Sequence, residues 1–389
     1  MAAAMTSEPI RVLHLITSLG RGGAEMMLRK LVLGMDRTRF FNVVVCMTAG
    51  GVHADALRAA GIDVHCLDLR RGLPGSTALL RVAGICRRFR PHVIQGWMYH
   101  ADAFAVGLRV ISSHARRAGW LWNVRCSDME LAKYNPLTRL VIHGLTSVSA
   151  WPDAVMVNSW AGQRHHTLLG YRPRRWIVLP NGFDTTAYAP DPSAAAWLRQ
   201  TVGIPGDAPV ATLVARVDPM KDHGTFLAAV AEAARHVPGL HAILVGRGTG
   251  PGGSLDGDIA RLGLANRVHG LGERSDVARI LAGSTCTALS SAFGEGFPNV
   301  IGEAMACATP CVVTDVGDAA RIVGTTGLVV PPRQPAAFAT ALATLAAEES
   351  NAHQRRGQQA RERIVSRFSL PAVIAAYSRA YAAVAVRAN

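Results

Sequence analysis

Residues 290–306 read SSAFGEGFPNVIGEAMA, and this stretch follows an apolar strand candidate with a glycine-rich loop and then a helix candidate. Pro298 stands where the helix would begin, a position that needs no backbone N–H. Amides at the start of a helix attract phosphate together with the helix dipole, and glycines let the backbone approach it closely. The stretch therefore predicts a phosphate-binding loop formed by the backbone of Gly296, Phe297, Pro298, Asn299 and Val300.

Two carboxylates accompany this loop, Glu295 within it and Glu303 in the helix, with seven residues between them. An ionised carboxylate only accepts hydrogen bonds, so it does not bind a diphosphate directly. Hydroxyls of a sugar and of a ribose are therefore the expected partners. The alternative for a single glutamate is a solvated surface residue or a helix-start residue.

A basic turn precedes this segment in the chain. Arg216 and Lys221 flank the turn between an apolar strand candidate, residues 210–217, and a helix that starts near Gly224. Both cations are placed to converge on a leaving diphosphate and to neutralise the charge that develops on it. A solvated basic turn is the alternative. Asp222 is expected to cap the following helix.

The first half of the chain offers weaker candidates at the ends of predicted strands. Gly22 and Gly23 follow the strand candidate of residues 10–16 and open a helix, a pattern shared with many phosphate sites and with simple tight turns. His100 lies just beyond the strand candidate of residues 92–95, at the edge where a parallel sheet binds ligands. A buried structural histidine is the alternative for His100.

The Glu-x7-Glu pattern with its GluGlyPhePro core, residues 295–303, closely resembles the signature of the family 4 glycosyltransferases. The resemblance covers nearly the whole chain. It implies an α/β protein with the GT-B fold, in which two Rossmann-like domains present parallel sheets to a central cleft. It also implies sugar transfer with retention of anomeric configuration.

By this likeness, Glu295 contacts the donor sugar, Glu303 contacts the ribose, and the amides of residues 296–300 contact the sugar and the phosphates. Arg216 and Lys221 match basic residues of the family. The likeness implies no metal ion and no cofactor, with a nucleoside-diphosphate sugar as the donor substrate.

The resemblance extends to the first half of the chain. Gly22 and Gly23 are similar to the family's GlyGlyAlaGlu loop, whose glycines face the donor phosphates and the acceptor. The family often has a histidine near the reacting sugar at the place of His100. Arg321 stands where many relatives carry Glu, so no role is carried over to it. The catalytic residues implied are His100, Arg216, Lys221 and Glu295.

Short apolar strand candidates alternate with segments of helical spacing, which predicts two parallel sheets wrapped by helices. The strand candidates are residues 10–16, 42–47, 64–67, 92–95, 120–124, 154–158, 176–179, 210–217, 241–245, 267–271, 286–290, 311–314 and 327–330. We expect an N-terminal acceptor-side domain at residues 1–183 and a C-terminal nucleotide-sugar-binding domain at residues 184–370, with a linker at 184–193. A C-terminal helix at 371–389 is expected to pack back on the first domain or against the second.

Charge and composition constrain the partners only broadly. The 41 basic and 27 acidic residues give a net charge of +14, which favours anionic partners such as nucleotides, lipid phosphates or nucleic acid. Arg116, Arg117 and Arg125 cluster with Trp120 and Trp122, which alternate as in a buried strand. This cluster is either a membrane-facing patch or part of the core. The seven scattered cysteines form no metal-binding pattern.

The sequence also suggests where the protein acts. No apolar run approaches the roughly 18 residues needed to cross a bilayer. Residues 1–9 carry neither the basic start nor the apolar region of a signal peptide. We therefore expect a cytoplasmic protein, with peripheral contact at the anionic inner membrane face as a further expectation.

These observations favour a retaining, metal-independent glycosyltransferase that moves a sugar to a glycan or lipid-linked acceptor, in cell-surface polysaccharide or glycolipid synthesis. Nucleic acid is not an expected partner. A nucleotide-sugar epimerase of the same fold and a basic, non-enzymatic membrane- or nucleic-acid-binding protein are the alternatives. An NAD site at Gly246, Gly248 and Gly250 has the wrong spacing for GxGxxG, and no lysine completes a Walker A loop.

Overall fold

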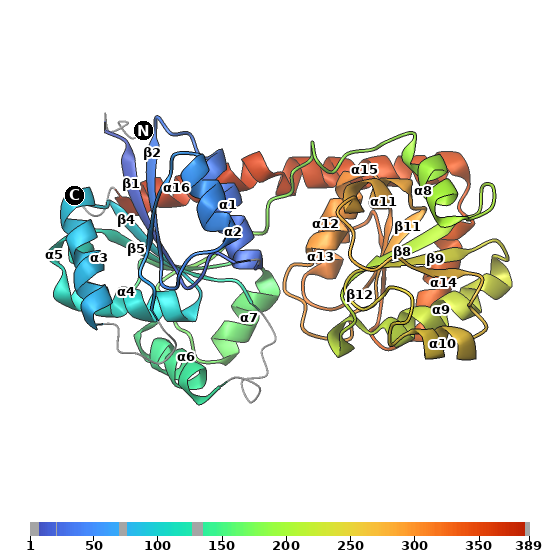
Figure 1. Ribbon diagram of the computed structural model, residues 1–389, viewed down its shortest axis with the longest axis horizontal. Helices are drawn as coiled ribbons and strands as arrows, with labels where there is room; N and C mark the ends of the chain where they lie inside the picture. Colours follow the sequence, from blue (N-terminus) through green and yellow to red (C-terminus); the bar gives the residue numbers. More distant parts are fainter. Residues whose placement is uncertain (1–7, 21, 70–75, 127–134, 386–389) are drawn as a thin grey trace. The chain divides into compact units, whose positions relative to one another are not determined.

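The computed structural model describes residues 8–20, 22–69, 76–126 and 135–385 (Figure 1). The chain divides into two compact units, Met1–Pro180 with Pro371–Asn389, and Asn181–Leu370. Each unit contains one parallel β-sheet with helices. Residues 1–7 of the segment considered for a signal peptide lie outside the described residues.

The first unit is built on a seven-stranded parallel sheet in the order β3-β2-β1-β4-β5-β6-β7. Its inner strands read as near-continuous apolar runs because both faces of a parallel sheet are covered. The strands are β1 (Ile10–Ile16), β2 (Phe40–Cys46), β3 (Asp63–Cys66), β4 (Val93–Trp97), β5 (Gly119–Val124), β6 (Ala154–Val157) and β7 (Trp176–Val178).

Helices connect these strands, as the sequence predicts. They are α1 (Gly23–Gly34), α2 (Val52–Ala59), α3 (Ser76–Phe89), α4 (Tyr99–Ile111), α5 (Ser113–Arg117), α6 (Pro136–Val148) and α7 (Trp160–Leu168). Two of them, α4 and α5, lie between β4 and β5. Buried side chains of α3, α4 and α6 share one hydrophobic core with the sheet.

The second unit repeats the architecture with a six-stranded parallel sheet in the order β10-β9-β8-β11-β12-β13. The strands are β8 (Val210–Val214), β9 (His241–Val245), β10 (Val268–Gly270), β11 (Cys286–Leu289), β12 (Cys311–Thr314) and β13 (Leu328–Val330). The helices are α8 (Ala194–Val202), α9 (His223–His236), α10 (Asp256–Arg261), α11 (Val277–Gly283), α12 (Asn299–Ala306), α13 (Ala319–Val323), α14 (Pro335–Ala346) and α15 (Ser350–Phe368), with a short 3₁₀ helix at Pro219–Lys221.

The units divide three residues before the expected boundary at 183/184, because Phe183 belongs to the second unit. Its backbone N–H donates to the Phe368 carbonyl at 2.9 Å, and its own carbonyl accepts from the Leu370 N–H at 2.8 Å. The following residues also belong to this unit, since the Arg361 guanidinium donates to the Tyr188 carbonyl at 3.2 Å. Residues 184–193 are therefore part of the second unit and do not link the two.

Helix α16 (Leu370–Ala385) carries the chain back to the first unit. Tyr381 donates its hydroxyl hydrogen bond to the Gln95 side chain of β4. Tyr377 accepts a 3.0 Å hydrogen bond from Asn123 of β5, and its ring stacks on Trp97. The last four residues of the expected helix, 386–389, lie outside the described residues.

The tryptophans of the suspected membrane patch lie in the core. Trp120 and Trp122 are 2% and 0% exposed, and their rings meet edge to face on β5. The membrane-facing interpretation is therefore wrong for these two side chains. Within the described residues, no helix combines the length and apolarity that crossing a membrane requires.

Candidate active site

The order of strands singles out one position in each sheet. In the second unit the chain runs outward from β8 through β9 to β10, and then outward on the other side from β11. In the first unit the same reversal falls between β1 and β4. Open parallel sheets bind ligands outside the carboxyl ends of the strands at such a reversal. These two positions are therefore the candidate binding edges.

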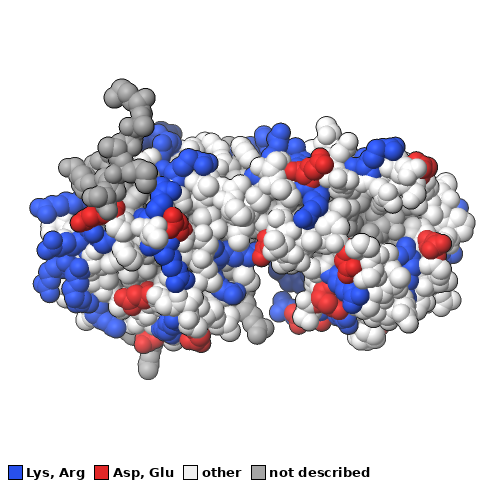
Figure 2. All heavy atoms as spheres, turned by 90° about the horizontal axis from the view of Figure 1, so that it is seen from above, with Lys and Arg blue, Asp and Glu red and all other residues white. Residues whose placement is uncertain are grey.

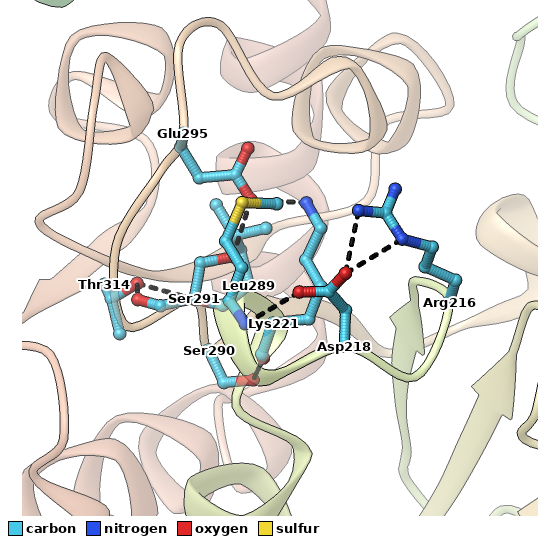
Figure 3. Close-up of polar contacts among 9 residues, drawn as sticks. Arg216, Asp218, Lys221, Leu289, Ser290, Ser291, Glu295 and Thr314 are labelled. Atoms are coloured by element: carbon cyan, nitrogen blue, oxygen red, sulfur yellow. Dashed lines mark hydrogen bonds and ion pairs between the residues drawn. The ribbon is translucent and has the colours of Figure 1, made fainter. Parts of the chain in front are cut away.

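At the β8/β11 position, a lysine and a glutamate meet (Figure 3). Lys221 Nζ lies 2.5 Å from Glu295 Oε1, and the two side chains are 17% and 7% exposed. The buried Ser291 hydroxyl donates a second hydrogen bond to the same Oε1 at 2.6 Å. The structure thus brings together two residues that are 74 positions apart in the sequence.

Backbone contacts hold the loops that carry this pair. The Ser290 hydroxyl donates to the Lys221 carbonyl at 2.8 Å, and the Ala292 N–H donates to the Met220 carbonyl at 2.9 Å. Thr314, at the end of β12, donates to the Ser291 carbonyl at 2.7 Å. The segments that follow three adjacent strands are therefore fastened to one another (Figure 3).

Arg216 is paired differently from Lys221. Its guanidinium donates to Asp218 Oδ2 at 3.1 and 2.8 Å, and its side chain is half exposed. The Met220 N–H bonds the other carboxylate oxygen at 2.9 Å. This amide first, and then Arg216, hold the pKa of Asp218 below its usual value. Of the two cations in the turn after β8, Lys221 thus contacts Glu295 and Arg216 contacts Asp218.

Asp222 caps helix α9, as the sequence predicts. Its side chain accepts a 3.1 Å hydrogen bond from the Thr225 N–H. Its backbone is in the left-handed region with φ of 46°, a conformation that Asp tolerates better than most residues. This turn lies between Lys221 and the start of α9.

Helix α12 begins at Asn299, one residue after Pro298, which is its N-cap. Pro298 makes no side-chain capping hydrogen bond, and the first-turn amides of a helix have no partner within the helix itself. The Gly296 carbonyl is held by the Asp318 N–H at 2.9 Å. Gly317 has φ of 62°, and a Cβ at this residue would lie 2.2 Å from the Glu295 carbonyl oxygen. Only glycine permits this close support of the loop.

Phe297 points its ring into the protein. The ring is 5% exposed and stacks on Phe183 with centroids 6.0 Å apart. A donor at this loop can therefore meet only the backbone of Phe297. Of its neighbours, Asn299 accepts a 2.6 Å hydrogen bond from the Asn181 amide, and Val300 is half-buried in the first turn of α12.

Glu303 lies on α12 beside Tyr188. Burial first, and then the charge of Glu303, raise the pKa of the Tyr188 hydroxyl, which hydrogen-bonds this carboxylate. Arg361 fixes the Tyr188 loop by donating to its carbonyls. The carboxylate expected to meet a ribose is thus oriented by a tyrosine that the sequence did not single out.

The first unit places its three candidates at its own binding edge. Gly22 is the N-cap of α1, after β1, and Gly23 is the first residue of that helix. A Cβ on Gly22 would lie 2.1 Å from Glu25 Oε2, whereas space around Gly23 is open. His100 is in the first turn of α4, after β4, and burial lowers the pKa of its imidazole. Since β1 and β4 are neighbours, all three residues lie at the strand reversal.

Besides Tyr188, two further residues that the sequence did not single out support this site, Asp218 and Ser291. Asp218 stands two positions after Arg216 and before a proline, a turn signal that its pairing with Arg216 explains. Ser291 has no distinctive sequence context. Among the described residues, no group of three or more His, Cys, Asp or Glu side chains is arranged to hold a metal ion.

Two family models match the chain, one in each half. Residues 22–182 match the glycosyl transferase 4-like domain, and residues 208–348 match the glycosyl transferases group 1. Solved structures share the architecture: that of Anabaena HepE in complex with UDP has a TM-score of 0.81 and 24% identity, covering 96% of this chain and 100% of that one. A Rickettsia africae glycosyltransferase has a TM-score of 0.78 and 16% identity, with 97% and 98% covered.

The two parallel-sheet units and these similar structures define a protein with the GT-B fold. The chain belongs to the family 4 glycosyltransferases. A D-inositol 3-phosphate glycosyltransferase of Segniliparus rotundus is 32% identical over 228 residues, which are 57% of this chain and 48% of that protein. The putative glycosyltransferase EpsF of Bacillus subtilis is 25% identical over 321 residues, 80% of each. The chain spans about half the length of the D-inositol 3-phosphate glycosyltransferases it matches.

Proposed function

We propose that this protein transfers a sugar from a nucleoside-diphosphate sugar to an acceptor hydroxyl, with the donor's diphosphate at the β8/β11 edge of the second unit. The observation that carries the proposal is the contact of Lys221 with Glu295, which stands in the loop directly before helix α12. A cation and free amides bind the phosphates, and the carboxylate binds sugar hydroxyls.

In the protein without donor, Lys221 and Glu295 neutralise each other across 2.5 Å. A diphosphate carries more negative charge than one carboxylate and competes for the Lys221 ammonium, which has three donors. Glu295 keeps its hydrogen bond from Ser291 and becomes available to the sugar. Donor binding thereby exchanges one ion pair for another and leaves neither charge buried alone.

The reaction proposed is retaining and independent of metal. As the bond between the sugar and the diphosphate breaks, negative charge grows on the leaving nucleotide, and Lys221 stabilises it. Arg216 assists after its half-exposed guanidinium leaves Asp218. Gly22, Gly23 and His100 of the first unit are proposed to meet the reacting sugar and the acceptor, with His100 acting as a neutral imidazole.

The donor proposed is a uridine nucleotide, because the solved structures of similar fold include complexes of HepE with UDP and with UDP-glucose. The acceptor proposed is a glycan or lipid-linked sugar. Relatives named for D-inositol 3-phosphate make a phosphorylated polyol the second acceptor class to test. The site of action proposed is the cytoplasm.

An assay with UDP-glucose and other UDP-sugars, each with and without acceptors of both classes, tests this proposal. We expect a product that requires an acceptor, whose anomeric configuration by NMR equals that of the donor, and whose yield is unchanged by EDTA. Conversion of the donor into its epimer without an acceptor would instead establish the epimerase alternative. Inversion or full loss with EDTA would contradict the proposed mechanism.

A further inference from the structure

Helices α3, α4 and α5 of the first unit pack on one another and present a strongly basic outer surface. Residues 76–118 contain seven arginines and a single acidic residue, Asp102, whose side chain is fully buried. In Figure 2 basic side chains gather at the left margin, where Figure 1 places α3 and α5. The exposed members define the α3–α5 surface: Arg81, Arg87, Arg88, Arg90, Arg116 and Arg117.

The seventh arginine, Arg109, is not part of this surface and instead connects α4 with α5. Arg109 turns inward, donates to the carbonyls of Ala115 and Ala118 at 2.9 Å each, and lies over the Trp120 ring. It thereby holds α5 against the end of α4. The six outer arginines take part in no ion pair with another described residue, and their side chains are exposed.

Large aliphatic side chains lie among these arginines. Leu80 of α3 is 67% exposed, and Val110 and Ile111 at the end of α4 are 69% and 45% exposed. Arginines beside exposed aliphatic residues are the composition of surfaces that enter the interface of an anionic bilayer. Single-stranded nucleic acid would instead call for exposed aromatic stacking platforms, and Phe89, the aromatic residue of α3, is half-buried.

We propose that the α3–α5 surface docks this protein on membranes rich in anionic lipids. The arginines supply attraction to the lipid phosphates, and Leu80, Val110 and Ile111 enter the headgroup region. Arg87, Arg88 and α5 precede β4 and β5, so they lie near the amino ends of these strands. The carboxyl ends of β1 and β4, which Gly22, Gly23 and His100 follow, are at the opposite edge of the sheet.

Membrane docking can be tested separately from sugar transfer. Sedimentation with vesicles measures docking in the absence of donor. We expect the full-length protein to sediment with phosphatidylcholine vesicles that contain phosphatidylglycerol, and not with phosphatidylcholine alone. Salt at about 0.5 M should weaken the contact, since it screens the charges. The double variant Arg87→Gln with Arg88→Gln should bind roughly 30-fold more weakly, because each lost charge weakens binding about fivefold.

A control variant with two other arginines replaced distinguishes a local binding surface from an effect of the total net charge. Arg355→Gln with Arg367→Gln removes two exposed charges from α15 in the second unit and should leave vesicle binding within about twofold. Val110→Ser with Ile111→Ser should lower binding at every salt concentration. Equal thermal midpoints of the variants exclude misfolding as the cause. The proposal would be overturned if both arginine pairs lost vesicle binding equally, or if the unaltered protein did not bind vesicles. Binding of RNA by a protein that does not bind vesicles would also overturn it.

Discussion

At the candidate active site, a few side chains have partners that could not be predicted from the sequence. The basic turn predicts cations near the diphosphate, but it does not reveal that Lys221 faces Glu295 while Arg216 faces Asp218. Glycine spacing predicts an amide loop, but not that the Phe297 ring turns inward onto Phe183. These pairings arise because the sheet order places segments distant in sequence side by side.

Ser291 tests the positioning of Glu295 at this scale. Ser291→Ala removes a 2.6 Å hydrogen bond to a charged group, which contributes about 1.5 kcal/mol or more. We expect kcat to fall roughly tenfold, while the Kd for UDP stays within about twofold because phosphates meet Lys221 and backbone amides. Ser291→Thr should recover most of kcat. An unchanged kcat in the alanine variant would remove Ser291 from the site.

His100 should determine how the reaction responds to acid. Burial lowers the pKa of its imidazole, so the neutral form persists from alkaline pH down past the ordinary pKa of about 6.5. We expect kcat/KM to be flat near neutrality and to fall only below about pH 6.5, as the imidazole gains a proton. His100→Asn should lower the rate and remove this acid limb. An identical acid limb in both proteins would assign it to another group.

At the scale of elements, apolar runs and helical spacing predict the fold well. Every strand candidate coincides with a strand, with ends displaced by at most three residues. The largest displacement is in β8, which ends at Val214 where the chain turns toward Lys221. The prediction of a linker at residues 184–193 is wrong, because this stretch has no regular pattern in the sequence. Its attachment to the second unit depends on Arg361 of α15, which is remote in sequence.

The packing of α12 against Phe183 requires a glycine at position 302. A Cβ on Gly302 would lie 2.1 Å from the ring of Phe183, so Gly302→Ala forces the ring to move. Overpacking of this kind costs about 1–3 kcal/mol, and we expect a lower thermal midpoint. Gly257→Ala in α10 is a matched control, because its Cβ would meet nothing within 4 Å. Equal midpoints for the two variants would contradict the packing described for α12.

At the scale of the whole molecule, the C-terminal helix is part of the first unit although the second unit precedes it in the chain. Val373, Tyr377, Tyr381 and Val384 of α16 are buried. A chain ending at Leu370 should therefore lose the folding transition of the first unit in calorimetry and keep that of the second. Two unaltered transitions after truncation would show that α16 is dispensable.

Binding of the donor's diphosphate by Lys221 is tested by isothermal calorimetry with UDP. Loss of a charged donor to phosphate should weaken binding by roughly tenfold or more in Lys221→Ala. Lys30→Ala, on α1 of the first unit, is the control and should bind UDP like the unaltered protein. We therefore expect the two lysine variants to differ in UDP affinity by this factor. Equal UDP affinity for Lys221→Ala and the unaltered protein would contradict it.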